Sequence, residues 1–98
     1  MILVTGSFIA KQGQLAQALA PSIDHVHRSR AEPGCISHAV HQDAENPQRL
    51  VFIEEWSDRA ALAAHFALPA SRAFAKAVGA LAAAPPTINV FEAERIAV

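Results

Sequence analysis

Two apolar runs separated by a polar, proline-containing turn dominate the middle of this 98-residue sequence. The runs cover Cys35 to Gln42 and Arg49 to Trp56, and the segment between them carries turn-forming residues at both ends. Runs of strand length joined by such a turn predict a β-hairpin with a long loop. The second run is apolar on both of its alternating sides, so both faces of the sheet are expected to be covered.

A strand and a helix are predicted before the hairpin. Residues 2–10 are rich in β-branched and aromatic side chains, which is typical of a strand. Apolar residues then recur at helical spacing up to Val26, and Pro21 is expected to kink or divide that helix. The helix should stop at Glu32-Pro33-Gly34, where the glycine permits a turn.

A broken helix and a last strand are predicted after the hairpin. Ser57 or Asp58 can cap the helix by accepting hydrogen bonds from its free N–H groups. Pro69 should interrupt the helix before a second segment at residues 71–83, and residues 87–96 are expected to form the last strand. The order β-α-β-β-α-β predicts an α+β, ferredoxin-like fold, with one antiparallel sheet and both helices on one face.

The whole chain, residues 1–98, has room for only one domain. Helices on one side of the sheet cannot cover its other side, although the hairpin carries apolar residues on both. The sequence therefore predicts a homodimer in which the sheets of two chains pack face to face.

Composition argues against several classes of function. The net charge is −1 and there is no basic stripe, which argues against nucleic-acid binding. No run of about 18 apolar residues is present, so no membrane span is expected. Cys35 is the only cysteine, which excludes an intramolecular disulfide and fits a cytoplasmic location.

Two classes of cofactor lack their usual sequence signals. Residues 4–7 invite comparison with a dinucleotide-binding turn, but the second and third glycines of that motif are missing. The five histidines show no standard zinc-ligand spacing. We therefore expect neither a nucleotide cofactor nor a metal, although His38, His65 and Glu54 could still meet in space.

The expected pairing of the hairpin places polar groups in an apolar wall. If the strands pair about residue 46, His38 lies across from Glu54, with the two Cβ atoms about 5 Å apart. A slip of one residue would move these two side chains to opposite faces. The same face would carry two apolar cross-strand pairs, Val40 with Phe52 and Ile36 with Trp56.

Each polar group in this region has two interpretations. A buried carboxylate beside an imidazole can fix the histidine tautomer and raise its basicity, so that the pair acts as a general base. The same pair could simply be a hydrogen-bonded part of the core. His65, on the apolar face of the next helix, is either a core residue or a polar contact in a pocket. Trp56 is either core or a flat wall for a ring-shaped ligand.

Short motifs spread along the chain match those of a known family. They are Glu32-Pro33-Gly34-Cys35, Asp43 and Pro47 in the loop, Glu54-Glu55-Trp56, Ala61-Leu62, His65 and Phe74. With these motifs the chain resembles the antibiotic biosynthesis monooxygenase family, which includes small quinol monooxygenases. The resemblance implies a ferredoxin-like fold in a dimeric α+β barrel. It also implies cofactor-independent oxygenation of a quinol, a phenol or a polycyclic aromatic.

In that chemistry the protein deprotonates the substrate, which itself supplies the electrons to oxygen. We expect His38 to be the base, Glu54 to orient it and His65 to be a further catalytic contact. The expected substrate-binding residues are apolar or aromatic: Ile36, Val40, Phe52, Trp56 and Phe66. The chain departs from the family in having no tyrosine, and His38 stands where many relatives carry one. Two alternatives stay open, a non-catalytic dimer that binds a small ligand and a haem-binding or haem-degrading relative.

Overall fold

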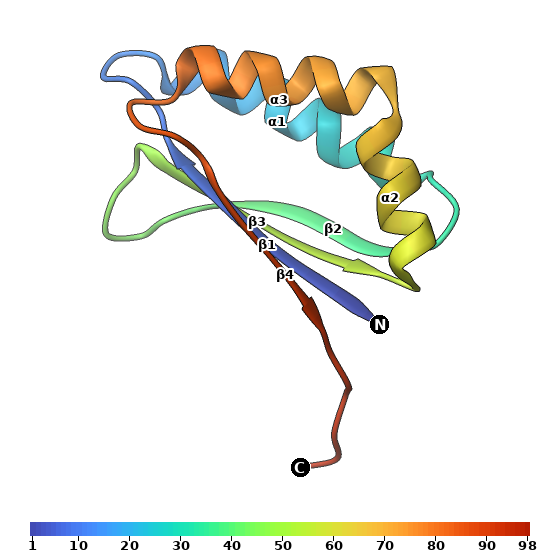
Figure 1. Cartoon of the computed structure of the whole chain (residues 1–98). Coiled ribbons are helices and arrows are strands. Elements are labelled where there is room, and N and C mark those ends of the chain that lie inside the picture. The colour runs from blue at the N-terminus through green and yellow to red at the C-terminus, as the bar shows by residue number, and fades with distance from the viewer.

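The computed structural model describes all 98 residues, which form one antiparallel sheet with helices on a single side (Figure 1). The strands lie in the order β2-β3-β1-β4. In chain order the elements are β1 (Ile2–Ile9), α1 (Leu15–Arg30), β2 (Cys35–Gln42), β3 (Arg49–Trp56), α2 (Arg59–Ala67), α3 (Pro69–Leu81) and β4 (Thr87–Glu92). The predicted ferredoxin-like order is confirmed. None of the helices has the length and apolar character needed to cross a bilayer.

Alternation along the two central strands directs large apolar side chains toward the helices. In β1, Val4 and Phe8 are buried, and in β3, Leu50 and Phe52 are buried beside them. Antiparallel pairing places Phe8 next to Leu50 on the same face of the sheet. The main core is completed by residues from α1 and α3 and the adjoining turns: Ala10, Ala18, Val26, Val78 and Ala82.

Helix α1 runs as a single helix through Pro21, so the prediction that this residue divides it is wrong. A proline removes one backbone hydrogen bond, whereas α1 has buried residues on both sides of Pro21, from Ala18 to Ser29. The buried face carries small and polar residues together with Val26, and Leu15 and Leu19 pack against the core while only partly buried. Its buried hydroxyls are satisfied, because Ser22 donates to the Ala18 carbonyl and Ser29 donates to the His25 carbonyl, both at 2.7 Å.

The break between α2 and α3 falls where it was predicted. Asp58 caps α2 by accepting a hydrogen bond from the Ala61 N–H at 2.8 Å. Leu68 separates the two helices, and Pro69 occupies the first turn of α3, where a missing N–H is tolerated. Because the chain turns at this point, α2 lies across one end of the sheet while α3 runs over it (Figure 1).

The last strand is shorter than the sequence predicted. β4 ends at Glu92 instead of Ile96, and the residues beyond it have no regular structure and extend away from the body of the molecule (Figure 1). The reason is that β1 is the only neighbour of β4, and its first paired residue, Ile2, lies opposite Glu92. Past that point the chain has no strand with which to pair.

The face of the sheet opposite the helices is uncovered in the single chain. Leu3 and Phe91 pair across β1 and β4 on this face, and Thr5 pairs with Ile53 of β3. Phe91 is 49% exposed and Ile53 is 37% exposed. These apolar groups lie on the side of the sheet that the sequence predicted would pack against a second chain.

Candidate functional site

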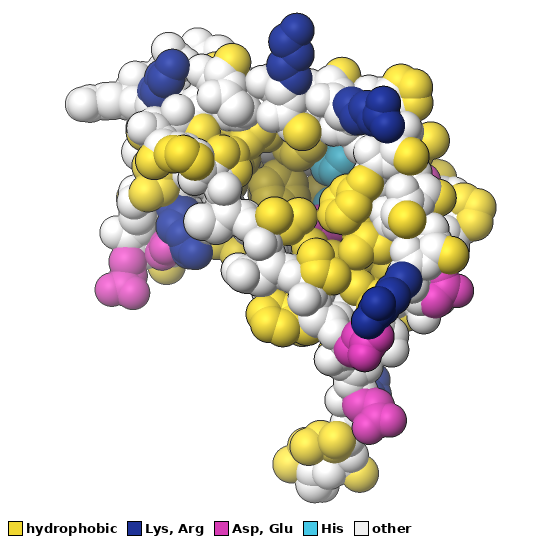
Figure 2. Space-filling view, in the orientation of Figure 1, with side chains coloured by type: hydrophobic (Ala, Val, Ile, Leu, Met, Phe, Trp, Pro, Cys, Tyr) yellow, Lys and Arg dark blue, Asp and Glu magenta, His cyan; other side chains and the backbone are white.

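A cavity of about 240 Å³ lies between the helices and the sheet, bounded by α3 on one side and the start of β4 on the other. Figure 2 shows an opening rimmed by hydrophobic side chains, with histidine visible inside. Its aromatic and polar walls include Phe8, His25, Phe52, Glu54, His65, Phe66 and Phe74. A wider hollow of about 710 Å³ next to Arg59 and Glu92 has no aromatic wall, so the smaller cavity is the better site for a ring-shaped ligand.

The predicted pairing of the hairpin is confirmed at its centre, where His38 lies across from Glu54 and Val40 across from Phe52. His38 Nε2 is 3.2 Å from Glu54 Oε1, and the indole N–H of Trp56 donates to the same oxygen at 3.0 Å. The His38 contact is close but poorly aligned, and neither of its buried ring nitrogens has a well-formed hydrogen bond. A buried imidazole with both nitrogens unsatisfied is uncommon and calls for an explanation.

Glu54 is an ionised carboxylate at neutral pH. Burial would raise the pKa of Glu54, but the His38 ring, the Trp56 indole and the nearby His65 together outweigh that effect and hold the pKa below its usual value. A negative charge is therefore present at the inner wall of the cavity.

The start of β2 departs from the predicted pairing. A bulge between Cys35 and Ser37 places Cys35, instead of Ile36, across from Trp56. Ile36 is 56% exposed, so the prediction that it faces Trp56 in the apolar wall is wrong. An extra residue in one strand changes the side on which its neighbours point. The pKa of the Cys35 thiol is raised, first by burial and then by Glu32 and Glu54, which argues against a nucleophilic role.

A second imidazole–carboxylate pair joins α2 to the loop after α1. His65 Nδ1 lies 2.8 Å from Glu32 Oε1, and the His65 ring is tilted on Trp56 with the ring centroids 4.6 Å apart. When Nδ1–H donates to the carboxylate, Nε2 carries the free lone pair of the ring. The sequence interpretation missed this role of Glu32, because it treated the residue only as part of the stop at Pro33.

His25 is the other polar residue that the sequence interpretation missed. It lies on the buried face of α1, is 6% exposed and stacks on Phe74 with centroids 4.1 Å apart. Burial, followed by the neighbouring His38 and His65, lowers the pKa of His25 to about 3, so the ring is neutral at pH 7. A faint signal was present, since Ala18, Ser22, His25 and Ser29 recur at helical spacing.

The predicted site residues divide between the cavity and the structure behind it. Those that line the cavity are Phe52, Glu54, His65 and Phe66. His38 is buried behind this surface, against Glu54. Trp56 is 0% exposed, so it supports Glu54 and His65 from within the core and is not an open wall. Val40 packs against the main core, and Ile36 points to solvent.

The fold and the site together define a class of protein: a small ferredoxin-like domain with imidazole–carboxylate pairs at the inner end of an aromatic cavity. The model of the family described as antibiotic biosynthesis monooxygenase matches residues 1–77 of the chain. The protein belongs to this family, as its sequence motifs indicated.

Similar proteins agree with that assignment. An uncharacterized protein of Synechocystis sp., sll1783, is 33% identical over 91 residues, which are 93% of this chain and 62% of that protein. The chain therefore spans less than two thirds of the length of this relative. A crystal structure described as an antibiotic biosynthesis monooxygenase is 28% identical, with a TM-score of 0.89 over 97% of this chain and 100% of that one. The structure of Rv0793 from Mycobacterium tuberculosis is 25% identical, with a TM-score of 0.90 over 99% and 98% of the two chains.

Proposed function

We propose that the protein is a cofactor-independent monooxygenase that acts on a quinol, a phenol or a fused-ring aromatic. One observation carries the proposal: the His65–Glu32 pair, with Nδ1 and Oε1 2.8 Å apart, stands at the wall of a cavity that is otherwise largely aromatic and apolar. Such a cavity suits a flat ring, and an oriented imidazole suits the removal of an acidic proton from that ring.

In this proposal His65 takes the proton. The Glu32 carboxylate holds Nδ1–H, leaves Nε2 as the accepting atom and stabilises the imidazolium that forms. The electron-rich anion then reduces oxygen directly. For a substrate with a methylene carbon between two rings, one oxygen atom becomes the new carbonyl and the other leaves as water, while the two methylene hydrogens supply the protons of that water. The substrate itself supplies the electrons.

The rest of the wall would orient the ring and exclude water. Phe52 and Phe74 stand edge to face, with centroids 5.8 Å apart, and Phe66 lies beside His65 with a centroid separation of 5.7 Å. His38 acts through Glu54 in this scheme, as a positioning residue behind the cavity surface. The role of base therefore moves from His38, where the sequence placed it, to His65.

Oxygen uptake with a panel of hydroquinones and anthrones tests the proposed activity. The His65→Gln variant is expected to lose about 10²–10⁴-fold in rate, which is the usual contribution of a general base. His27→Gln is the matched control, because His27 is exposed on α1 and does not line the cavity, and it should retain the wild-type rate. Equal rates in wild type and His65→Gln would exclude His65 as the base.

The His38→Ala variant separates the two imidazole–carboxylate pairs in the same assay. Wild-type rates in this variant would remove His38 from the mechanism and leave the His65 assignment intact. Saturable binding of a hydroquinone without any oxygen uptake in wild type would overturn the monooxygenase proposal in favour of the ligand-binding alternative.

We also propose that two chains associate through the uncovered face of the sheet. The apolar side chains on it, including Ile53 and Phe91, are 37% and 49% exposed in the single chain. Two sheets that pack face to face bury such residues in a common layer.

A charge placed in the centre of that layer should separate the chains. The Ile53→Lys variant is expected to elute as a monomer in size-exclusion chromatography with light scattering, because an unpaired charge is costly to bury. Thr87→Lys, at the margin of the same face, is the control and should remain a dimer. A monomeric wild-type protein at micromolar concentration would contradict the proposal.

A further inference from the structure

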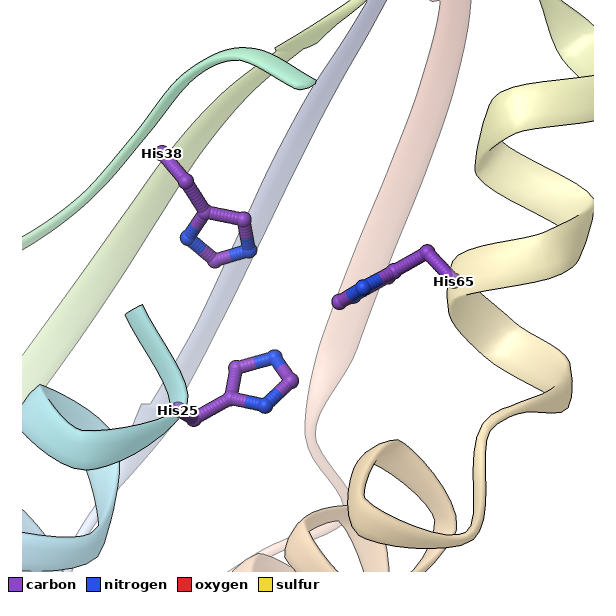
Figure 3. Close-up of side chains that lie close together, drawn as sticks. All are labelled: His25, His38 and His65. Atoms are coloured by element: carbon purple, nitrogen blue, oxygen red, sulfur yellow. The ribbon is translucent and has the colours of Figure 1, made fainter. Parts of the chain in front are cut away.

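Three histidines from three different elements converge on one point in the interior. His25 comes from α1, His38 from β2 and His65 from α2, and Figure 3 shows the three rings turned toward one another. One ring nitrogen of each lies within 4.8 Å of the corresponding atoms of the others. All three residues are buried, with 6%, 2% and 2% of their surface exposed.

We propose that His25, His38 and His65 bind one divalent transition-metal ion of the zinc class. Three imidazoles leave a fourth position for water or a ligand, which is the arrangement of catalytic rather than structural zinc sites. The inference does not rest on the proposed oxygenase activity, because it uses only the geometry and chemistry of the three rings.

The spacing of the rings is close to what such an ion requires. Zinc–nitrogen distances of about 2.0–2.1 Å place the nitrogens of a tetrahedral site about 3.4 Å apart. The present maximum of 4.8 Å therefore calls for the rings to approach one another by about 1.4 Å at most. We expect rotations of the three side chains to supply this movement.

The unsatisfied nitrogens of His38 are an independent indication of a ligand. Neither ring nitrogen has a well-formed hydrogen bond, although both are buried. Leaving a buried polar atom without a partner costs about 1–3 kcal/mol. A metal ion on either nitrogen would give that atom a partner, and Glu54 Oε1 lies 3.2 Å from Nε2 in the present arrangement.

The surroundings also have the character of an outer coordination shell. Metal-binding histidines commonly donate their second N–H to a carboxylate, and His65 Nδ1 is held by Glu32 at 2.8 Å. Glu32 and Glu54 bring two negative charges next to the three rings, and their side chains are only 16% and 8% exposed. Two carboxylates near a site for a doubly charged ion balance its charge. His25, neutral at pH 7, offers its lone pair without first losing a proton.

The site faces the cavity, so its fourth position is accessible to small molecules. His25, His65 and Glu54 all line that cavity. Binding of a metal and base catalysis by His65 exclude each other, because both require the lone pair of Nε2. With any substrate that supports oxygen uptake, stoichiometric Zn²⁺ is therefore expected to abolish the uptake, and a chelator is expected to restore it.

Titration with Co²⁺, followed by its visible absorption, tests the site directly. Wild-type protein is expected to bind one Co²⁺ per chain with the intense bands of a tetrahedral ion, and Zn²⁺ should displace it. The His25→Ala variant should lose the spectrum. His27→Ala and His41→Ala are the controls, since both residues are exposed, and they should bind as wild type does. Absence of the spectrum in wild type, or an unchanged spectrum in His25→Ala, would overturn the proposal.

Two further measurements keep all three buried histidine rings in place, so they do not depend on a variant that could fail to fold. In wild-type protein, Zn²⁺ should shift the ring ¹⁵N resonances of the three buried histidines and leave those of His27 and His41 in place. Glu32→Gln keeps the shape of the side chain and should lower the affinity for the metal by about 10–100-fold, as the loss of an outer-shell carboxylate does. Equal shifts of all five histidines would mean nonspecific binding and would reject the site.

Discussion

Replacing Gly34 with alanine is expected to lower the free energy of unfolding by about 3 kcal/mol, because backbone strain contributes about 1–2 kcal/mol and overpacking about 1–3 kcal/mol. Gly34 has a φ of +82°, a backbone conformation that residues with a side chain rarely adopt. A Cβ atom at this position would lie 2.5 Å from the Cβ of Ala61 and 2.7 Å from the hydroxyl of Ser57.

The neighbouring backbone cannot readily move to relieve this clash. The Gly34 carbonyl accepts a hydrogen bond from the Ser57 N–H at 2.8 Å, and the Cys35 N–H donates to the Glu32 carbonyl at 3.2 Å. Movement of the loop would also displace Glu32 from His65. We therefore expect Gly34→Ala to disturb the site as well as the stability of the fold.

Gly13→Ala is the matched control for this prediction. Gly13 has nearly the same φ, +79°, but a Cβ atom there would meet nothing within 4 Å. The control should cost only the backbone strain, about 1–2 kcal/mol. Urea denaturation of both variants measures the difference. If the two substitutions cost the same, the contacts with Ala61 and Ser57 contribute nothing to the effect.

The fold was predictable because its signals are local. Alternation in the two hairpin runs indicated the strands, Pro69 marked the break between helices, and the centre of the hairpin turn defined the pairing of His38 with Glu54. The bulge near Ile36 was missed because the pairing was extended from the centre of the hairpin in strict alternation, whereas a bulge shifts the register by one residue.

The site was predicted only in part, because its members come from segments far apart in the sequence. His25 and Glu32 have no motif, and they meet His38 and His65 only when α1 and α2 pack on the same face of the sheet. The buried face of α1 is also rich in small and polar residues, so the apolar spacing marked that face only in part: Leu15, Leu19 and Val26 pack on the core. Ile23, which belongs to that spacing, is 38% exposed.

Acid is expected to destabilise the metal-free protein well before the carboxylates titrate. The folded pKa of His25 is lowered from 6.5 to about 3 by burial and by His38 and His65. Between these two values the unfolded chain binds a proton at His25 that the folded chain does not bind. The free energy of unfolding therefore falls as the pH falls, by as much as about 1.4 kcal/mol per pH unit well below pH 6.5.

Glu54 adds to the loss at lower pH and does not oppose it. Its pKa is lowered in the folded protein, despite burial, mainly because of His38 and Trp56. Its contribution to stability is therefore complete above the unfolded value of 4.5 and is lost as the pH falls through the lower folded value. Glu54 therefore contributes little to a loss between pH 6.5 and about 5, where the lowered pKa of His25 acts.

Urea denaturation between pH 7.5 and 5, with a chelator present to keep the site free of metal, measures this loss. Wild-type protein should lose at most about 2 kcal/mol over the range. His25→Phe should remove most of that dependence, because phenylalanine keeps a ring against Phe74, where the present centroid separation is 4.1 Å, and cannot bind a proton. His27→Phe, on the exposed side of the same helix, should retain the wild-type dependence. A wild-type protein whose stability is constant or rises as the pH falls to 5 would show that His25 takes up its proton in the folded state. Burial of His25 among aromatic rings and two other imidazoles would then not be enough to keep its ring neutral.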